Sequence, residues 1–313
     1  MQAKRFAAID IGTVTCRLLV ADVDDTGLRE LYRHAAITNL GEGVDATGEL
    51  SEAAIERTSA QVAQYMQVVS KYTLPNAGVR IIASATSASR DAKNSAVFAE
   101  KLARLGVQLA VISGQREAQL SFLGASADFA GKQILVADVG GGSTELIAGM
   151  GGRAPLQIHS FDIGCRRVTE RFLVGDPATP AQIKSAHEWA KPQFKTYFDE
   201  LSQRGFTIDC MVAVAGTATS VVSIDKEMEV YDSARVHGSV VTREALQRVT
   251  GRLEALSVEQ RRVVVGLQPG RAPVIVAGMY ILDDLLQLAK LDSFTVSESD
   301  ILQGMIMDAA QQN

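Results

Sequence analysis

The sequence has 313 residues, of which 47% are hydrophobic and only 5% are aromatic. That length exceeds the size at which a single core usually stops growing, so we expect two domains with aliphatic cores, which suits α/β better than all-β structure. The net charge of -5 at pH 7 argues against general nucleic-acid or membrane-surface binding.

The first half of the chain opens with a strand, a tight glycine turn and a second strand over residues 6–20. Ser51 then begins a helix whose apolar residues recur at helical spacing. Ser113 begins another helix further along. Between these two helices we expect a strand at 79–84, a helix near 92–105 and a strand at 107–112.

The second half repeats the opening pattern, because residues 134–148 match residues 6–20 when Asp10 is aligned with Asp138. Its further expected elements are strands at 156–161 and 210–216, helices at roughly 180–204, 242–254 and 269–290, and a final helix over 298–311 that returns to the first domain. No linker-like segment separates the halves. We therefore expect domains of residues 1–124 plus 298–313 and of residues 125–297, which face each other across a cleft.

The cysteines and the apolar stretches favour a cytoplasmic protein. Cys16, Cys165 and Cys210 lie far apart, so we expect buried thiols in a reducing compartment and neither a disulfide nor a zinc site. The opening MQAKRFAAID is unlike a signal peptide. The longest apolar stretches, such as VIVAGMYIL, fall short of the roughly 18 residues that a membrane span needs. We expect a soluble protein with neither membrane nor nucleic-acid partners.

The two glycine turns have the chemistry of phosphate sites. Successive N–H groups freed by such a turn form a nest for anions, and glycine lets a phosphate approach the main chain. Ser143 and Thr144 add hydroxyl donors, and Glu145 adds a second acid. Asp138 would repel a bare phosphate, so its presence indicates a divalent cation between them, Mg²⁺ first and Mn²⁺ as the alternative. A plain glycine-rich hairpin is disfavoured because the pattern is duplicated.

Duplicated hairpins of this kind resemble those of the superfold of acetate and sugar kinases, heat-shock chaperones and actin. That resemblance implies an α/β fold of two ribonuclease-H-like, actin-like domains with an interdomain cleft. Longer stretches resemble one family, the exopolyphosphatase and guanosine pentaphosphate phosphatase (Ppx/GppA) family. They include AIDIGT, ASATSASRDAKN, VISGQREAQLSFLGA, VADVGGGSTELI and VAVAGTATS, and they run in family order from residue 8 to residue 305. We expect the short two-domain form, without the extra helical domain of longer members.

The resemblance implies the residues of the site. Glu117 matches the catalytic glutamate that orients or deprotonates the attacking water, and Arg90 matches a phosphate-binding arginine. Asp10, Asp138 and Glu145 match the ligands of the cation or its waters. The positions that match phosphate-binding residues are Gly12, Thr13, Gly140, Gly141, Gly142, Ser143, Thr144, Gly216 and Thr217. Arg166, Arg167 and Arg271 are candidates for a basic track along a polyphosphate chain.

The function implied by the resemblance is Mg²⁺-dependent hydrolysis of terminal phosphate from inorganic polyphosphate, with pppGpp as the alternative substrate. The acidic chain and the two-domain form favour polyphosphate, with short chains preferred. The sequence departs from the family pattern at Val14, Thr15, Thr38, Asn39 and Arg116. Val14 and Arg116 would support a different class, a non-catalytic polyphosphate or alarmone sensor. The same segments disfavour a sugar or acetate kinase. Only base rates for soluble oligomers favour a symmetric homodimer.

Overall fold

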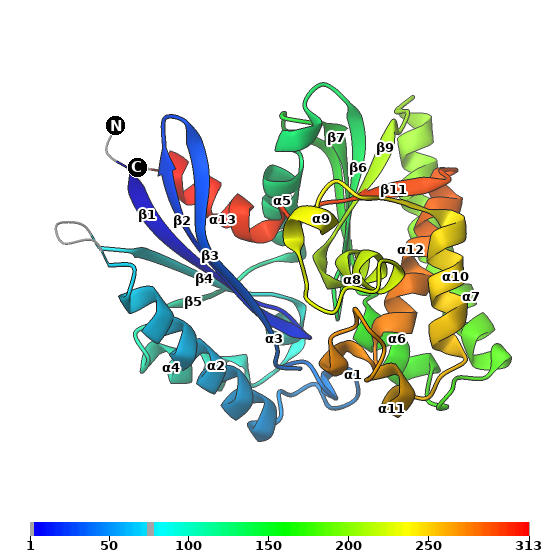
Figure 1. Cartoon of the computed structure of the whole chain (residues 1–313), viewed down its shortest axis with the longest axis horizontal. Coiled ribbons are helices and arrows are strands. Elements are labelled where there is room, and N and C mark those ends of the chain that lie inside the picture. The colour runs from blue at the N-terminus through cyan, green and yellow to red at the C-terminus, as the bar shows by residue number, and fades with distance from the viewer. Residues whose placement is uncertain (1–2, 74–77, 313) are drawn as a thin grey trace. The chain divides into compact units, whose positions relative to one another are not determined.

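The computed structural model describes residues 3–73 and 78–312 of the chain (Figure 1). The chain forms two compact units, which we call the first unit (residues 1–124 and 301–313) and the second unit (residues 125–300). Each unit contains one mixed β-sheet with helices packed on it. The α/β class predicted from the sequence is confirmed.

The sheet of the first unit has the strand order β3-β2-β1-β4-β5. Its strands are β1 (Lys4–Ile11), β2 (Thr15–Asp24), β3 (Gly27–Ile37), β4 (Arg80–Ala85) and β5 (Leu109–Val111). β1 pairs antiparallel with β2 and parallel with β4, and β4 pairs parallel with β5. The carboxyl ends of β1, β4 and β5 therefore meet at one edge of the sheet.

Helices cover both faces of this sheet. They are α1 (Val44–Thr47), α2 (Glu52–Ser70), α3 (Ser87–Asp91), α4 (Ser95–Ala103), α5 (Gly114–Ala125) and α13 (Ile301–Gln311). Successive side chains of a strand point to opposite faces, so Ile9 of β1 joins the core under α2 and α4, whereas Phe6 joins the core under α13. The Ser51 hydroxyl accepts a hydrogen bond from the Ala54 N–H and caps α2 as predicted.

The last helix completes the first unit. α13 packs against β1 and β2, and its Ile301 and Met305 are buried in the core that Phe6 lines. Gly304 lets α13 approach α5, because a Cβ at this position would lie 1.9 Å from the carbonyl oxygen of Leu120. α13 therefore comes close to α5, the helix that carries Glu117, at this glycine.

The sheet of the second unit has the order β10-β11-β9-β6-β7-β8. Its strands are β6 (Gln133–Val139), β7 (Thr144–Met150), β8 (Pro155–Phe161), β9 (Cys210–Val214), β10 (Val240–Thr242) and β11 (Ser293–Val296). β6, β9 and β11 are parallel, so their carboxyl ends also share one edge. The β6–β7 hairpin repeats the β1–β2 hairpin of the first unit, as the sequence predicts.

Helices of the second unit surround the mostly buried α12. The helical segments are η1 (Ala127–Phe129), α6 (Cys165–Phe172), α7 (Pro180–Gln203), α8 (Ala215–Asp225), α9 (Ser233–Val236), α10 (Arg243–Glu254), α11 (Val258–Arg261), η2 (Pro269–Arg271) and α12 (Ile275–Ala289). α12 contacts α6, α7, α8 and α10. Its apolar residues are buried almost along its whole length.

Several predicted boundaries are wrong by a few residues. The helix expected over 269–290 begins only at Ile275, because Pro273 has no N–H to donate within a helix. The final helix, expected from residue 298, begins at Ile301 after a turn in which the Ser297 hydroxyl accepts from the Ser299 N–H. The helix expected near 92–105 spans only Ser95–Ala103. The sequence patterns did not predict β3, α6, α8, β10 and β11.

No helix within the described residues has the length and hydropathy that a membrane crossing demands. Cys16 and Cys165 are buried and Cys210 is partly buried, and all three thiols are free. Burial raises the pKa of the Cys165 thiol, so this side chain behaves as a small apolar group.

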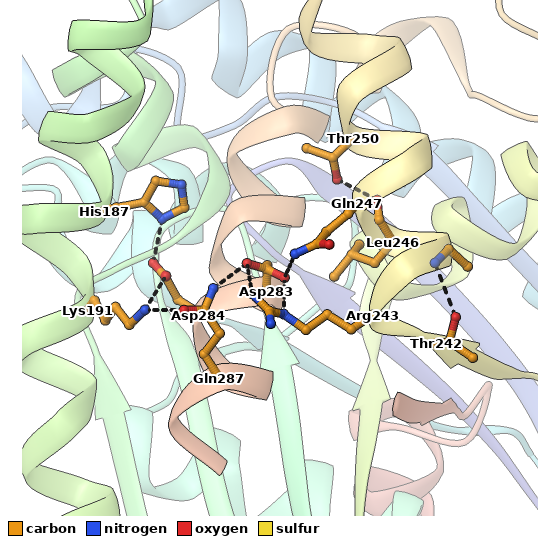
Figure 2. A network of polar contacts seen from close by, with 11 residues as sticks. His187, Lys191, Thr242, Arg243, Leu246, Gln247, Thr250, Asp283, Asp284 and Gln287 are labelled. Carbon is orange, nitrogen blue, oxygen red and sulfur yellow. Dashed lines mark hydrogen bonds and ion pairs between the residues drawn. The ribbon is translucent and has the colours of Figure 1, made fainter. Parts of the chain in front are cut away.

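A polar network ties α7, α10 and α12 together in the second unit (Figure 2). Asp284 of α12 is buried, lies 2.8 Å from Nδ1 of His187 on α7 and lies 3.6 Å from the Lys191 ammonium. The preceding residue, Asp283, accepts a 2.7 Å hydrogen bond from Nε of Arg243 on α10. The hydrogen bond to Asp284 raises the pKa of His187, although burial opposes the shift.

The first prediction compares two glycine-to-alanine substitutions. Gly304→Ala places a methyl group against the Leu120 carbonyl, so we expect it to lower the free energy of unfolding by about 1–3 kcal/mol through overpacking. Gly251→Ala, in α10 with no atom near the added methyl group, should raise it by up to about 1 kcal/mol. Urea denaturation of both variants measures the difference. Equal effects would contradict the proposed packing of α13.

The second prediction concerns the pH dependence of stability. Because the pKa of His187 is raised in the folded protein, its protonated ring stabilises the fold fully below about pH 6.5, and this contribution disappears as the pH rises through the folded pKa. We expect His187→Gln to lower the urea midpoint at pH 5.5 more than at pH 9. The difference should vanish in an Asp284→Asn background, and a pH-independent loss would refute the assignment.

Candidate functional site

The predicted residues of the first unit gather at the carboxyl edge of its sheet. β1 leads into the turn at Gly12, β4 leads into α3 with Arg90, and β5 leads into α5 with Glu117. Ligands of α/β sheets bind beyond the carboxyl ends of the strands. The topology therefore brings Asp10, the turn, Arg90 and Glu117 to the place where a ligand site is expected.

The turn between β1 and β2 is tight. The Gly12 N–H donates to the carbonyl of Thr15 at 2.9 Å, and a Cβ on Gly12 would lie 3.3 Å from that oxygen. Asp10, one residue before the end of β1, is 4% exposed and lies directly opposite Arg17 of β2. The Arg17 guanidinium donates to its carboxylate at 2.7 Å, so the charge of Asp10 is compensated within the hairpin.

Arg90 and Glu117, the predicted catalytic residues, are in contact. Nη1 of Arg90 donates to Oε2 of Glu117 at 3.2 Å and to the Ile112 carbonyl at 3.0 Å. Glu117 is 8% exposed and lies in the first turn of α5, where the helix dipole favours a carboxylate. Among the described residues both contacts of Arg90 use Nη1, so Nε and Nη2 can still bind a phosphate oxygen.

The second hairpin repeats this geometry with three glycines. The Gly140 N–H donates to the Ser143 carbonyl at 3.0 Å, which matches the bond between Gly12 and Thr15. The Thr144 hydroxyl donates to the Ile163 carbonyl at 2.5 Å and is fully buried. A hydroxyl has only one proton to donate. The hydroxyl proton of Thr144 is therefore engaged within the fold, and the role of Thr144 in phosphate binding stays a prediction.

Asp138 and Glu145 face each other across the β6–β7 ladder. The two residues are directly opposite in register and are 6% and 1% exposed. Ser160 of β8 donates to Oε1 of Glu145 at 2.6 Å. Facing carboxylates repel each other unless a cation lies near them. Mg²⁺ binds through one or two carboxylates and keeps several waters, so this donor set fits the predicted cation.

No group of three or more acidic, histidine or cysteine side chains suited to a metal was found in the described parts of the chain. Glu117 and Arg90 belong to the first unit, whereas Asp138 and Glu145 belong to the second. The cleft that would join the two sets stays a prediction.

The predicted phosphate-binding residues Gly216 and Thr217 follow the carboxyl end of β9, which lies beside the carboxyl end of β6. Gly216 and Thr217 form the first turn of α8, after Ala215 in the left-handed region with φ of 64°. The guanidinium of Arg271 lies against Gly216, where a Cβ would be 2.0 Å from Nη1. Thr217 is 2% exposed beneath Gly278 of α12. The structure thus places Arg271, a candidate for the basic track, beside the predicted phosphate-binding glycine.

Two residues that contact the predicted acids were not predicted from the sequence. Arg17 neutralises Asp10, and Ser160 binds Glu145. The repeat could have revealed Arg17, because the same alignment that sets Asp10 on Asp138 sets Arg17 on Glu145. Ser160 lies on a separate strand, and no sequence pattern links it to Glu145.

Comparison with known proteins identifies the class of this chain. Residues 19–313 match the Ppx/GppA phosphatase family. The chain belongs to this family of phosphatases, as the sequence motifs predict, and is a hydrolase.

Individual relatives cover the whole chain. Exopolyphosphatase 2 of Mycobacterium tuberculosis (strain ATCC 25618 / H37Rv) is 36% identical over 330 residues, which span 99% of this chain and 100% of the relative. A guanosine-5'-triphosphate,3'-diphosphate pyrophosphatase of Vibrio atlanticus (strain LGP32) is 28% identical over 98% of this chain, but this match covers 59% of the relative.

Solved structures of the family share the fold. The crystal structure of an exopolyphosphatase-like protein superposes with a TM-score of 0.86 at 31% identity and covers 100% of this chain and 99% of its own. The Aquifex aeolicus family member gives a TM-score of 0.77 at 29% identity over 99% of this chain and 98% of its own. The predicted actin-like fold is thereby confirmed.

The third prediction tests the cation at the facing carboxylates. We expect Mg²⁺ to raise the melting temperature of the wild type, because it relieves the repulsion between Asp138 and Glu145. Asp138→Asn should remove this increase while leaving the protein in EDTA at least as stable as the wild type. Asp199→Asn, at an exposed position on α7, is the control for loss of one charge. An undiminished Mg²⁺ effect in Asp138→Asn would rule out this site.

Proposed function

We propose that this protein is an exopolyphosphatase that removes terminal orthophosphate from inorganic polyphosphate with the help of Mg²⁺. The observation that carries the proposal is the contact between Arg90 and Glu117 at the carboxyl edge of the first sheet, beside the turn at Gly12. Such hydrolysis requires a group that orients water, positive charge on the transferred phosphoryl group and donors to its oxygens. Glu117 and Arg90 of the first unit supply the first two, and the N–H groups of each glycine turn are donors of the third kind.

The chain's own residues suggest how the reaction proceeds. Glu117 accepts a proton from water, or orients it, while Arg90 holds the carboxylate in place and offers Nε and Nη2 to a phosphate oxygen. The N–H groups of each turn are donors suited to phosphate oxygens. Asp138 and Glu145 would hold Mg²⁺, which would supply positive charge to neutralise the phosphate oxygens. Asp10 is the corresponding acid of the first unit.

The relatives favour polyphosphate over the alternative substrate. The relative named exopolyphosphatase is more similar and matches over its whole length, whereas the relative named for the guanosine nucleotide matches over little more than half of its length. Removal of the 5'-terminal phosphate of pppGpp remains the alternative, because it breaks the same kind of phosphoanhydride bond. The free thiols support a reducing, cytoplasmic location.

A sensor without catalytic activity is less well supported. Arg116, one of the departures from the family pattern, forms an ion pair with Asp308 of α13 at 2.5 Å. This contact explains the arginine by packing between α5 and α13. Val14, the other departure that pointed to a sensor, contributes backbone groups to the turn, and these do not depend on its side chain.

The fourth prediction tests catalysis. Glu117→Gln keeps the size of the side chain but removes its capacity to accept a proton, so we expect kcat for release of phosphate to fall by about 10²–10⁴ with little change in KM. The assay measures phosphate released from long-chain polyphosphate, tripolyphosphate, pppGpp and ATP, each with Mg²⁺ and with EDTA.

Glu100→Gln is the matched control, because Glu100 is an exposed acid on α4 of the same unit. It should behave as the wild type. Preferential release from pppGpp would select the alternative substrate. Unchanged release by Glu117→Gln from every substrate would overturn the catalytic assignment, and absence of release by the wild type would overturn the proposed function.

A further inference from the structure

The glycine turn of the second unit is held from one side by α6. The Gly140 carbonyl accepts from the Cys165 N–H at 2.9 Å, and the Gly141 carbonyl accepts from the N–H groups of Arg166 and Arg167 at 2.8 and 3.2 Å. The Gly142 carbonyl accepts from Nε of Arg167 at 2.9 Å. Three successive carbonyl groups of the turn therefore point towards the first turn of α6.

This arrangement sets the direction of the turn's N–H groups. In a trans peptide unit the carbonyl of one residue and the N–H of the next point in opposite directions. Bonds from α6 to the carbonyls of residues 140–142 thus turn the N–H groups of Gly141, Gly142 and Ser143 away from α6. Within the described parts of the chain, no protein acceptor is found for these three N–H groups.

The contact also completes α6. The first N–H groups of a helix have no partners within it, and Gly164, the N-cap residue of α6, provides no capping side chain. The turn carbonyls take the place of a cap. The positive end of the helix dipole therefore acts on these peptide units and polarises them, which makes the opposite N–H groups stronger donors to an anion.

In the first unit, a different segment, residues 38–41, donates hydrogen bonds to the carbonyls of the turn. We call residues 38–41 and residues 164–167 the supporting segments of the two turns. The Thr13 carbonyl accepts from the Gly41 N–H at 2.9 Å, and the Val14 carbonyl accepts from the N–H groups of Thr38 and Asn39 at 3.0 and 2.9 Å. These bonds turn the N–H groups of Val14 and Thr15 away from residues 38–41. The supporting segment follows β3 here and follows β8 in the second unit, so it has the same place in both sheets.

An arginine side chain binds backbone carbonyls at each turn or at its supporting segment. Arg57 of α2 donates through Nε to the Thr38 carbonyl at 2.5 Å and through Nη2 to the Asn39 carbonyl at 3.2 Å. The peptide unit whose carbonyl Arg57 binds carries the Asn39 N–H, which in turn binds Val14. Arg57 thus acts on the turn through one peptide unit, whereas Arg167 binds the turn directly.

Each supporting segment approaches its turn at a glycine. A Cβ on Gly41 would lie 2.3 Å from Cγ2 of Thr13, and a Cβ on Gly164 would lie 2.4 Å from the carbonyl carbon of Gly141. Thr13 and Gly141 are equivalent positions of the two hairpins when Asp10 is aligned with Asp138. The close approach is therefore part of the repeat.

We infer that Arg57 and Arg167 are positioning residues, which orient the N–H groups of the two turns towards phosphate by holding the turn carbonyls from behind. The inference rests on the proposed function for the identity of the anion. In this role α2, α6 and residues 38–41 orient the turns, and none of them needs to touch the substrate.

The experiment compares Arg57→Gln and Arg167→Gln with Arg248→Gln, which removes an exposed arginine of α10 and controls for the change in net charge. Calorimetry measures binding of inorganic tripolyphosphate with Mg²⁺ in a Glu117→Gln background, which should not consume the ligand, and steady-state kinetics measure hydrolysis of tripolyphosphate when Glu117 is kept. Each positioning variant should bind about tenfold more weakly, as loss of one charge-assisted hydrogen bond predicts. KM should rise by a similar factor, with a smaller change in kcat. Arg248→Gln should bind as the wild type does.

Hydrogen exchange without ligand separates positioning from direct contact with substrate. Arg57→Gln should speed exchange of the amides in residues 38–41, and Arg167→Gln should speed exchange in residues 164–167, with little change in melting temperature. Arg57→Lys keeps the charge but cannot bond both carbonyls in this way, so it should restore little of the lost affinity.

Three outcomes would overturn the inference: wild-type affinity in both positioning variants, an equal loss in Arg248→Gln, or unchanged exchange in both supporting segments. Failure of the wild type to bind or hydrolyse tripolyphosphate would instead count against the proposed function. Exchange in the supporting segments would still decide whether the two arginines hold them.

Discussion

The site depends on the direction of a few peptide groups. A backbone nest binds anions only when its N–H groups converge, and a short glycine turn has little intrinsic preference for that arrangement. In both hairpins the chain fixes the turn by one bond across it and by further bonds to its carbonyl groups. The acidic chain therefore needs no excess of basic side chains to offer donors to a phosphate.

The two hairpins have the same backbone but different charges. Asp10 lies opposite Arg17, whereas Asp138 lies opposite Glu145 at the equivalent position. The first hairpin thus pairs its acid with a base across the two strands, whereas the second places two acids opposite each other. The residue on the second strand, Arg17 or Glu145, is therefore one position at which the two hairpins differ in charge.

Sequence alone was sufficient for the parts of the structure that repeat or have strong local signals. The duplicated hairpins, the cap at Ser51 and the helix that begins after Ser113 follow from turn chemistry and periodicity. β3 and α6 were missed because β3 is a charged edge strand without simple alternation, and because α6 is capped by distant carbonyls and not by its own N-cap side chain. The roles of Arg57 and Arg167 could not be predicted, because they arise from contacts with backbone atoms that carry no sequence signal.

The return of α13 to the first sheet also affects how the chain folds. Ile301 and Ile306 complete a core that includes Phe6 and Leu19, although the whole second unit separates these residues along the chain. During synthesis on the ribosome, this apolar face of the first sheet stays uncovered until α13 has been translated, well after the second unit could have formed its own core. Exposed apolar surface of this kind promotes aggregation, so slow or interrupted translation before residue 301 would leave the nascent protein dependent on chaperones.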